Sequence, residues 1–180
     1  MVGTIDEFRA QLIGGGARAN QFKVEINNPR NAGAININLR TAAFLCSATT
    51  LPAMSVEEIE VPFRGRTIRI AGDRDFADPW EVTFLNDTDF MIKTAIELWS
   101  NGINDFALNT GVVSPGDYQT DLTVEQLDRD ETVLKTYILR NAWPTTSGSA
   151  IDLSMDTESA VEEFTCSWRY QHSEASGVNF

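Results

Sequence analysis

The stretch that decides the fold runs from Cys46 to Asp87 and reads CSATTLPAMSVEEIEVPFRGRTIRIAGDRDFADPWEVTFLND. Its pattern predicts four short strands, separated by a proline-marked turn, a tight Arg64-Gly65-Arg66 turn and an acidic loop. No residues in it are arranged as a catalytic site requires, but charges stand beside strand-forming residues throughout. We interpret this stretch as a surface that builds contacts between copies of the protein.

Alternating apolar and polar residues recur across most of the chain and are typical of half-buried strands. Residues 128–131 read as the turn of a hairpin between two such strands, whereas the sequence Trp143-Pro144-Thr145 predicts a break in the chain. Strands without alternating helices favour a mainly β fold, a β-sandwich or a small barrel. The predicted strands cover residues 20–28, 34–39, 43–49, 55–61, 67–71, 80–85, 118–127, 132–141, 151–153 and 160–171.

Two helices are predicted beside these strands. The main helix covers residues 87–100, begins at Asp87 or Thr88, and has an apolar face that packs against the outside of the sheet. A short helix over residues 4–13 begins at Thr4, with Glu7 three residues later, and ends at three glycines. We expect one domain over residues 1–180, with this helix and a glycine-rich joint at 1–19 and a β core at 20–172. The tail at 173–180 is expected to be mobile or held only by a partner.

The charge balance is strongly acidic and excludes some classes of partner. Asp and Glu number 26 against 14 Lys and Arg, for a net charge of −12. A duplex-DNA binder needs Lys and Arg to neutralise phosphates, and an anionic membrane would repel this chain. The charge serves solubility, or it forms a surface that repels a polyanion. No apolar run is long enough to span a membrane, and the start does not read as a secretory signal.

Catalytic and cofactor motifs are missing from the sequence. The single histidine, His172, has no second histidine for a zinc site, and we interpret it as a surface residue. The glycines at 14–16 lack the Lys-Ser/Thr ending of a phosphate loop. Cys46 and Cys166 lie in apolar, strand-like surroundings, which favours free thiols over a disulfide. The sequence therefore predicts no enzyme, no cofactor and no metal.

Charged clusters in the first stretch allow two interpretations. Asp73, Asp75 and Asp78 lack the glycine and glutamate spacing of a calcium loop, so we interpret them as part of a salt-bridge cluster that faces solvent or a partner. The only basic cluster surrounds Gly65 and extends to Arg69. It meets an acidic patch on another copy, or it protects a strand edge from unwanted pairing.

An ordered set of segments along nearly the whole chain resembles T-even-type phage tail tube proteins. The segments include a Val-Pro-Phe-x-x-Arg-x-Ile pattern at residues 61–68 and a Trp-x-Val-x-x-x-Asn-Asp pattern at residues 80–87. The loop over residues 28–39 is longer than the family's hairpin, and residues 173–180 read as an extension. The other matching segments are residues 17–26, 46–53, 71–76, 143–145 and the acidic residues before Phe164.

The resemblance implies a structural subunit of the virion, assembled in the host cytoplasm. Six copies would form a ring in which sheet edges join into a continuous barrel, and rings would stack into a hollow tube. A contractile sheath would surround the tube, and a baseplate and a tail terminator would close its ends. The tube would hold a tape-measure protein and then conduct DNA. The alternatives are the tube of a phage-like injection, bacteriocin or type VI secretion system, and a free ligand-binding β-sandwich.

Two sets of residues are candidates for this assembly. Asp121 and Glu125 share one face of the predicted hairpin over residues 118–141, and they line the channel in this interpretation, with Lys135 pairing one of the acids. Three further acids, Asp128, Asp130 and Glu131, lie at its turn, at a ring boundary. The candidates for contacts between subunits are Glu57, Glu60, Arg64, Arg66, Arg69, Asp73, Arg74 and Asp75.

Overall fold

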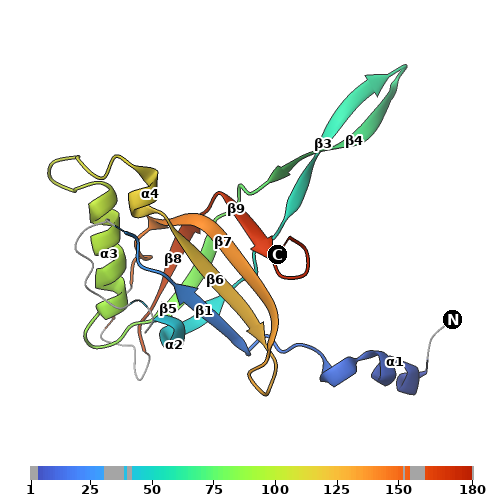
Figure 1. Cartoon of the computed structure of the whole chain (residues 1–180), viewed down its shortest axis with the longest axis horizontal. Coiled ribbons are helices and arrows are strands. Elements are labelled where there is room, and N and C mark those ends of the chain that lie inside the picture. The colour runs from blue at the N-terminus through green and yellow to red at the C-terminus, as the bar shows by residue number, and fades with distance from the viewer. Residues whose placement is uncertain (1–3, 31–38, 40–41, 152, 155–160, 180) are drawn as a thin grey trace.

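The computed structural model describes residues 4–30, 39, 42–151, 153–154 and 161–179, and its central feature is a seven-stranded antiparallel sheet (Figure 1). A short strand, β9 (His172–Ala175), pairs with β7 on the side opposite β6. The other six strands follow one another in space as β1 (Phe22–Ile26), β6 (Thr120–Leu127), β7 (Val133–Thr146), β8 (Glu163–Arg169), β5 (Trp80–Leu85) and β2 (Cys46–Thr49).

The long strand β7 belongs to two halves of this sheet. Its first part pairs with β6 and β9, and residues 143–146 pair with β8. The predicted break at Trp143-Pro144-Thr145 is therefore wrong. Pro144 lies at an irregularity in the register between β7 and β8, where a missing N–H donor is tolerated.

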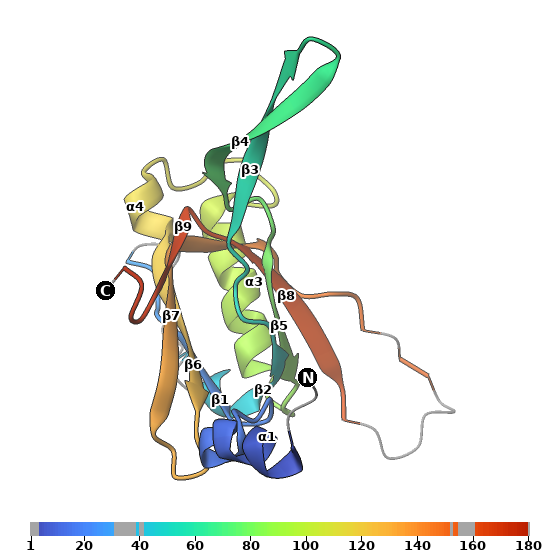
Figure 2. The same cartoon turned by 90° about the vertical axis from the view of Figure 1, so that its right-hand side faces the viewer.

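One hydrophobic core joins the two halves of the sheet to the main helix (Figures 1 and 2). The predicted alternation is confirmed in β5 and β8, where every second side chain is buried, and β1 and β6 each bury two alternating side chains. Aromatic rings pack against one another in this core. The ring centroids of Trp99 and Trp168 lie 5.3 Å apart, and those of Phe84 and Phe164 lie 5.7 Å apart. Such edge-on and tilted contacts stabilise a core beyond the area that they bury.

Helix α3 (Met91–Ile103) is the predicted main helix, but it begins and ends later than predicted. Asp87 caps it from outside, because its carboxylate accepts a hydrogen bond from the Met91 N–H at 3.1 Å. Phe90 precedes the helix in a left-handed conformation, with φ 51°. The buried residues of α3 have the spacing of one helix face, and they are Ile92, Ala95, Ile96 and Trp99. Mainly β structure with one main helix packed on it is thus confirmed.

Three further segments differ from the sequence predictions. Residues predicted as the start of a strand at 43 form a short helix, α2 (Ala42–Leu45). The tail predicted to be mobile contains β9, whose Ser173 and Ala175 are buried against β7. Residues 115–117, which lie outside the predicted strands and helices, and Tyr118, the predicted start of a strand, form the short helix α4 (Pro115–Tyr118). The predicted strand over residues 34–39 lies outside the described residues, apart from the buried Leu39.

Two elements project from the body. Strands β3 (Ser55–Phe63) and β4 (Arg66–Asp75) pair only with each other and form a long hairpin that extends away from the sheet (Figures 1 and 2). Helix α1 (Ile5–Gln11) lies at the end of an N-terminal arm. Among the described residues, no helix has the length and apolar character that spanning a bilayer would require.

Candidate assembly surfaces

The β3–β4 hairpin is held by its own strand pairing. Its register runs from Ser55 opposite Asp75 to Phe63 opposite Arg66. The turn uses Arg64 with φ 46° and Gly65 with φ 82°, the positive angles that a two-residue hairpin turn requires. An isolated two-stranded hairpin is only marginally stable in water, so this one calls for a partner.

One face of the hairpin is an exposed apolar stripe. Ile59 lies opposite Ile70, and Val61 lies opposite Ile68, with Phe63 next along β3. All five side chains are at least two-fifths exposed. A contiguous apolar patch of this kind marks an interaction surface. Sequence reasoning about the charges of this stretch missed it, although the period-two alternation was present.

The eight predicted contact residues all lie on this hairpin, but some already have partners within it. Arg69 lies 3.2 Å from Glu60 and 3.7 Å from Glu58, in exposed ion pairs of small energy. The Arg64 guanidinium lies 5.5 Å from the Phe63 ring centroid. The Arg74 guanidinium donates to the sulfur of Met54 at 3.7 Å. The remaining candidates, Glu57, Arg66, Asp73 and Asp75, form no ion pair within the described residues.

A bulge bends the base of the hairpin. The register shifts between Val56 and Glu58, opposite Arg74 and Ala71. Gly72 fits this crossing because a Cβ there would lie 3.0 Å from the carbonyl oxygen of Glu57. The bulge therefore sets the direction in which the hairpin leaves the body.

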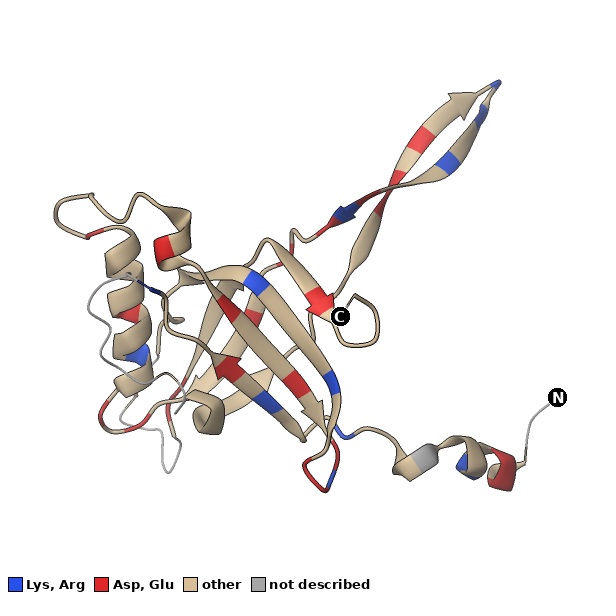
Figure 3. Cartoon of the chain, in the orientation of Figure 1, with Lys and Arg blue, Asp and Glu red and all other residues tan. Residues whose placement is uncertain are grey.

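A second candidate surface is the polar side of the four strands β1, β6, β7 and β9, which we call the four-stranded face. Leu122 and Val124 of β6 point into the core, so Asp121, Thr123 and Glu125 lie on the opposite side. Charged residues occur on all four strands (Figure 3). Sequence reasoning predicted the shared side of Asp121 and Glu125 from the same alternation.

An ion network crosses this face, and sequence reasoning missed its centre, Arg140. The Arg140 guanidinium lies 2.6 Å from the Asp121 carboxylate and 2.6 Å from the Glu174 carboxylate. Hydrogen bonding from Arg140 holds the pKa of Glu174 below its usual value. His172, predicted as a plain surface residue, lies 3.6 Å from Glu174. The network ties β9 to β7 and β6.

The turn between β6 and β7 is ordered by its own acids. Asp128 accepts a hydrogen bond from the Arg129 N–H at 2.8 Å. Asp130 accepts from the hydroxyl and the N–H of Thr132, and the hydroxyl bond is the main reason that the Asp130 pKa is lowered. Glu131 adopts a left-handed conformation with φ 64°. These carboxylates therefore shape the turn, whatever else they contact.

Lys135 does not neutralise the acids of the four-stranded face, contrary to prediction. Lys135 pairs with Gln126, the neighbour of Glu125 along β6. Successive side chains of a strand point to opposite sides of the sheet, so Lys135 lies on the side opposite Glu125. Its ammonium lies 5.8 Å from the Tyr137 ring. Lys23 pairs with Glu25 on the acidic side instead.

The four-stranded half of the sheet has two free edges. Among the described strands, β1 pairs only with β6, and β9 pairs only with β7. Unpaired N–H and C=O groups on such edges are templates for pairing with another chain. Both edges therefore belong to the candidate assembly surface.

The described residues contain neither a metal-binding cluster nor an activated thiol. No group of three or more His, Cys, Asp or Glu is placed to hold a metal ion there. Cys46 and Cys166 are free thiols, and burial raises their pKa to about 11 and about 12. A thiol becomes a strong nucleophile only as the thiolate, so neither cysteine is activated.

Comparisons with known proteins agree with one another. Residues 17–175 match the family model of the phage tail tube protein. The chain is 32% identical over 169 residues to the tail tube protein of Serratia phage KSP90, covering 93% of this chain and 94% of that protein. It is 34% identical over 160 residues to tail tube protein gp19 of Enterobacteria phage T4, covering 88% and 91%.

Solved structures of contractile injection systems share the fold. A chain of the PVC sheath-tube complex in its extended state superposes with a TM-score of 0.55 at 14% identity, covering 98% of this chain and 100% of that chain. A chain of the anti-feeding prophage tube-terminating cap gives a TM-score of 0.58 at 14% identity, covering 88% and 89%.

Proposed function

The chain belongs to the phage tail tube protein family, and from this premise we propose how it builds a tube. It is a structural component of the virion of a contractile-tail phage and not an enzyme. In our proposal, six copies form a ring, and rings stack into a hollow tube. The tube holds a tape-measure protein before DNA passes through it.

The observation that carries the proposal is the four-stranded face with its two free edges. Backbone pairing of β1 in one copy with β9 in the next would satisfy both edges and continue the sheet around a ring. Repetition of the same head-to-tail contact closes the ring. The Arg140 network supports this proposal because it holds the short strand β9 in place as a pairing edge.

The same face supplies a channel lining in this arrangement. It carries four acids, Glu25, Asp121, Glu125 and Glu174, against the two basic residues Lys23 and Arg140. Both basic residues are paired with acids of the face. A surface without unpaired cations repels phosphates, so DNA slides along it without binding. The turn acids Asp128, Asp130 and Glu131 then lie at a rim of the ring.

The β3–β4 hairpin supplies the contact between neighbouring copies. Its apolar stripe is covered by another subunit, while the arginines and acids beside the stripe fix the orientation of that contact. The candidate contact residues are Glu57, Glu60, Arg64, Arg66, Arg69, Asp73, Arg74 and Asp75. Because Arg69 is engaged within its own hairpin, Arg64, Arg66 and Arg74 are better placed to meet a neighbour's acids.

We place a contractile sheath on the side of α3. This helix covers the sheet with one face and leaves Glu97 and Leu98 exposed on the other. The baseplate and the tail terminator contact the two ends of the tube.

Electron microscopy of the purified protein tests the proposal. We expect hollow tubes or rings with six-fold averages, and a map in which Asp121 and Glu125 line the channel. Sedimentation as a monomer at all concentrations would favour a free ligand-binding module instead. A ring of another number, or a map with Asp121 on the outer wall, would refute this arrangement of subunits.

A further inference from the structure

Helix α1 is formed but buries none of its residues in its own subunit. Thr4 and Glu7 make a reciprocal capping box, with the Thr4 N–H donating to the Glu7 carboxylate at 2.8 Å and the Glu7 N–H donating to the Thr4 hydroxyl at 3.3 Å. Ile5, Phe8 and Leu12 are exposed and lie on one side of the helix, which we call the apolar side of α1. So short a helix is marginal alone in water, so its apolar side needs a covering surface.

The arm that carries α1 is anchored to the sheet at one end and jointed near the helix. The Gln126 side-chain amide donates to the carbonyl oxygens of Arg18 and Gln21, at 2.7 Å and 2.6 Å. The glycines at 14–16 all have positive φ, between 68° and 82°, which other residues rarely adopt. From this anchor, α1 extends away from the body (Figures 1 and 2). The arm is therefore placed to reach another copy.

The N-terminal arm and the β3–β4 hairpin lie at opposite ends of the subunit. The hairpin leaves the body at one end, and α1 lies at the other end (Figures 1 and 2). Subunits that stack head to tail bring opposite ends of successive copies together. Stacking of rings would therefore bring α1 of one copy toward the hairpin of a copy in the adjacent ring.

The apolar stripe of the hairpin is similar in length to the apolar side of α1. The stripe runs from Ile59 to Phe63 along β3, a distance of about 13 Å. The apolar side of α1 runs from Ile5 to Leu12, a distance of about 10 Å. Both surfaces are exposed in the subunit, so packing one on the other would remove apolar area of both from water.

A charged residue stands at each end of the stripe. Arg66 pairs in register with Phe63 near the tip of the hairpin. Glu57 precedes Ile59 by two residues along β3, so it lies on the same side of the strand near the base. Neither Arg66 nor Glu57 forms an ion pair within the described residues. The stripe therefore has an unpaired cation at one end and an unpaired anion at the other.

The charges of α1 match this arrangement. Arg9 follows Ile5 by four residues and flanks the apolar side, and it has no ion pair with the described part of the chain. The two acids of α1, Asp6 and Glu7, lie in its first turn. If the C-terminal end of α1 points to the base of the hairpin, Arg9 meets Glu57 and the two acids lie toward Arg66.

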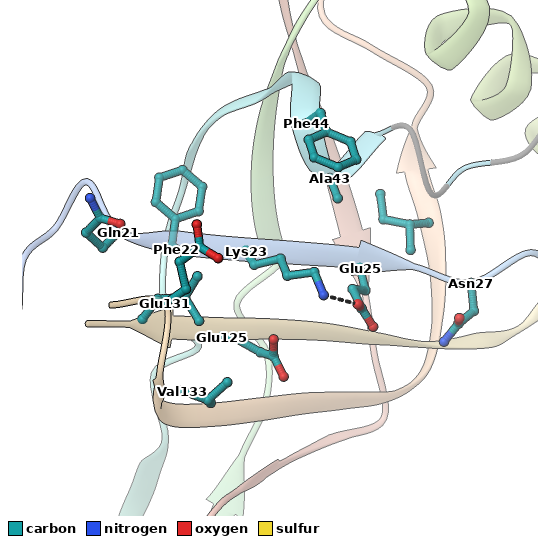
Figure 4. Close-up of a pocket in the computed structure, with 12 residues that line it drawn as sticks. Gln21, Phe22, Lys23, Glu25, Asn27, Ala43, Phe44, Glu125, Glu131 and Val133 are labelled. Carbon is teal, nitrogen blue, oxygen red and sulfur yellow. Dashed lines mark hydrogen bonds and ion pairs between the residues drawn. The ribbon is translucent and has the colours of Figure 1, made fainter. Parts of the chain in front are cut away.

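Two other surfaces fit α1 less well. The pocket in Figure 4 is lined by Lys23 and Glu25 of β1 and Glu125 of β6. In the proposed ring, the β1 edge pairs with a neighbouring strand and these side chains face the channel, so this pocket is closed to α1. The loop between α3 and α4 exposes Phe106 and Leu108, but it lies at the same end of the subunit as the hairpin (Figures 1 and 2). Stacking therefore does not bring this loop to α1.

We propose that the apolar side of α1 in one ring packs on the apolar stripe of a hairpin in the adjacent ring, with Phe8 against Ile59 and Ile70 and with Arg9 beside Glu57. The proposal rests on the tube assembly proposed above and names the partner of the stripe. The two elements that project from the subunit then form a single contact, which joins one ring to the next.

Photo-cross-linking of assembled protein tests the proposal. Benzoylphenylalanine replaces Phe8 in one preparation, which is mixed with ¹⁵N-labelled protein before assembly, and mass spectrometry maps the products. We expect cross-links between chains to peptides that contain Ile59 or Ile70, in tubes but not in the unassembled subunit. The same group at Leu98, 43% exposed on α3, is the control and should not reach these peptides. Tubes in which position 8 cross-links only within its own chain, only to the α3–α4 loop, or not at all would overturn the proposal.

A double-mutant comparison shows whether α1 and the stripe contact each other. Phe8→Ala should raise the critical concentration for tube formation about tenfold and leave the melting temperature of the free subunit unchanged, because α1 buries nothing in it. In protein that already carries Ile59→Ser and Ile70→Ser, Phe8→Ala should add less than about threefold, because the contact is already lost. Ala10→Ser changes a residue on the opposite side of α1 and is the matched control, which should assemble like wild type. Fully additive effects would show that the two surfaces bind different partners and would overturn the proposal.

A charge exchange tests the orientation of α1 on the hairpin. Arg9→Glu should raise the critical concentration about fivefold, because it replaces an attraction between exposed charges with a repulsion. Glu57→Arg in the same chain should restore most of this loss, and a double variant that assembles no better than Arg9→Glu would refute the orientation. If wild-type protein forms no tubes, the proposed function fails. If wild-type protein and Phe8→Ala assemble equally well, only the docking of α1 fails.

Discussion

Replacing both Ile59 and Ile70 with serine should separate folding of the subunit from assembly of the tube. The two side chains lie opposite each other on the apolar stripe of the hairpin, and each is 53% exposed. Full burial of such a side chain contributes about 1.5–3 kcal/mol. Covering the exposed half of each therefore contributes about 1 kcal/mol, or about 2 kcal/mol for the pair.

This loss of assembly free energy is measurable as a rise in the critical concentration for tube formation. A factor of ten in an equilibrium constant corresponds to about 1.4 kcal/mol, so the double variant should need about thirtyfold more protein to form tubes. Pelleting of tubes over a range of total protein concentrations measures this value. The free energy of unfolding of the subunit in urea should fall by no more than about 2 kcal/mol, because only the half of each side chain that its own hairpin covers is lost there.

A matched control lies on the same hairpin. Thr67 points from the face opposite the stripe, where it pairs in register with Pro62. Thr67→Ala should assemble at the wild-type concentration. If the double serine variant also assembles at the wild-type concentration, the stripe is not an interface. If it fails to fold, the hairpin packs on its own subunit in a way that its exposure contradicts.

Three further changes test other parts of the structure. Truncating Arg66 and Arg69 to alanine should leave the monomer folded but prevent polymerisation, and normal tubes in electron micrographs would refute the role of the charges. Hydrogen bonding from Arg140 lowers the pKa of Glu174. This hydrogen bond therefore stabilises the folded subunit fully above the unfolded pKa of Glu174, near 4.3. The stabilisation is lost as the pH falls through the lower pKa that Glu174 has in the folded subunit. Melting curves should show this loss as the pH falls below about 4.3 in wild-type protein and a smaller loss in Arg140→Met; identical curves would contradict it. Phe164→Ala removes a ring that is buried against Phe84 and should cost about 3–5 kcal/mol of unfolding free energy in urea, and a loss below about 1 kcal/mol would mean that the core repacks.

Alternation alone was enough to predict the strands whose inner side chains are large and apolar. Strand β5 was predicted with its observed bounds, and β1 and β8 were each found within a longer predicted range. Strand β9 has a different composition, His-Ser-Glu-Ala, without a large apolar residue. Its position depends on pairing with β7 and on the ion network around Arg140. Contacts between residues so far apart in the sequence leave no local pattern.

The boundaries of α3 and the start of β2 show a second limit. Phe44 and Leu45 belong to an apolar run that suits a strand or a helix equally, and the structure makes it a helical turn. Asp87 or Thr88 was predicted to start α3, and Asp87 does accept a hydrogen bond from the first helical N–H, but from outside the helix.

The charged residues of the candidate assembly surfaces could be predicted from the sequence, but the exposed apolar stripe of the hairpin could not. The acids of β6 and the arginines of the hairpin stand out in the sequence, and the structure places them on the polar face and on the projecting hairpin. The apolar stripe at Ile59 and Ile70 reads in sequence like any half-buried strand. Only the structure shows that no part of the described chain covers it.

The long strand β7 has a mechanical consequence. It is bonded along one part to β6 and β9 and along another to β8, so the edge strands and the half that carries α3 share a single continuous backbone. Tension applied along this strand loads its ladders in shear, where many hydrogen bonds must break together. Force that pulls the two halves of the sheet apart along this strand would therefore be carried by covalent chain and sheared ladders, and not by the peeling of one strand at a time.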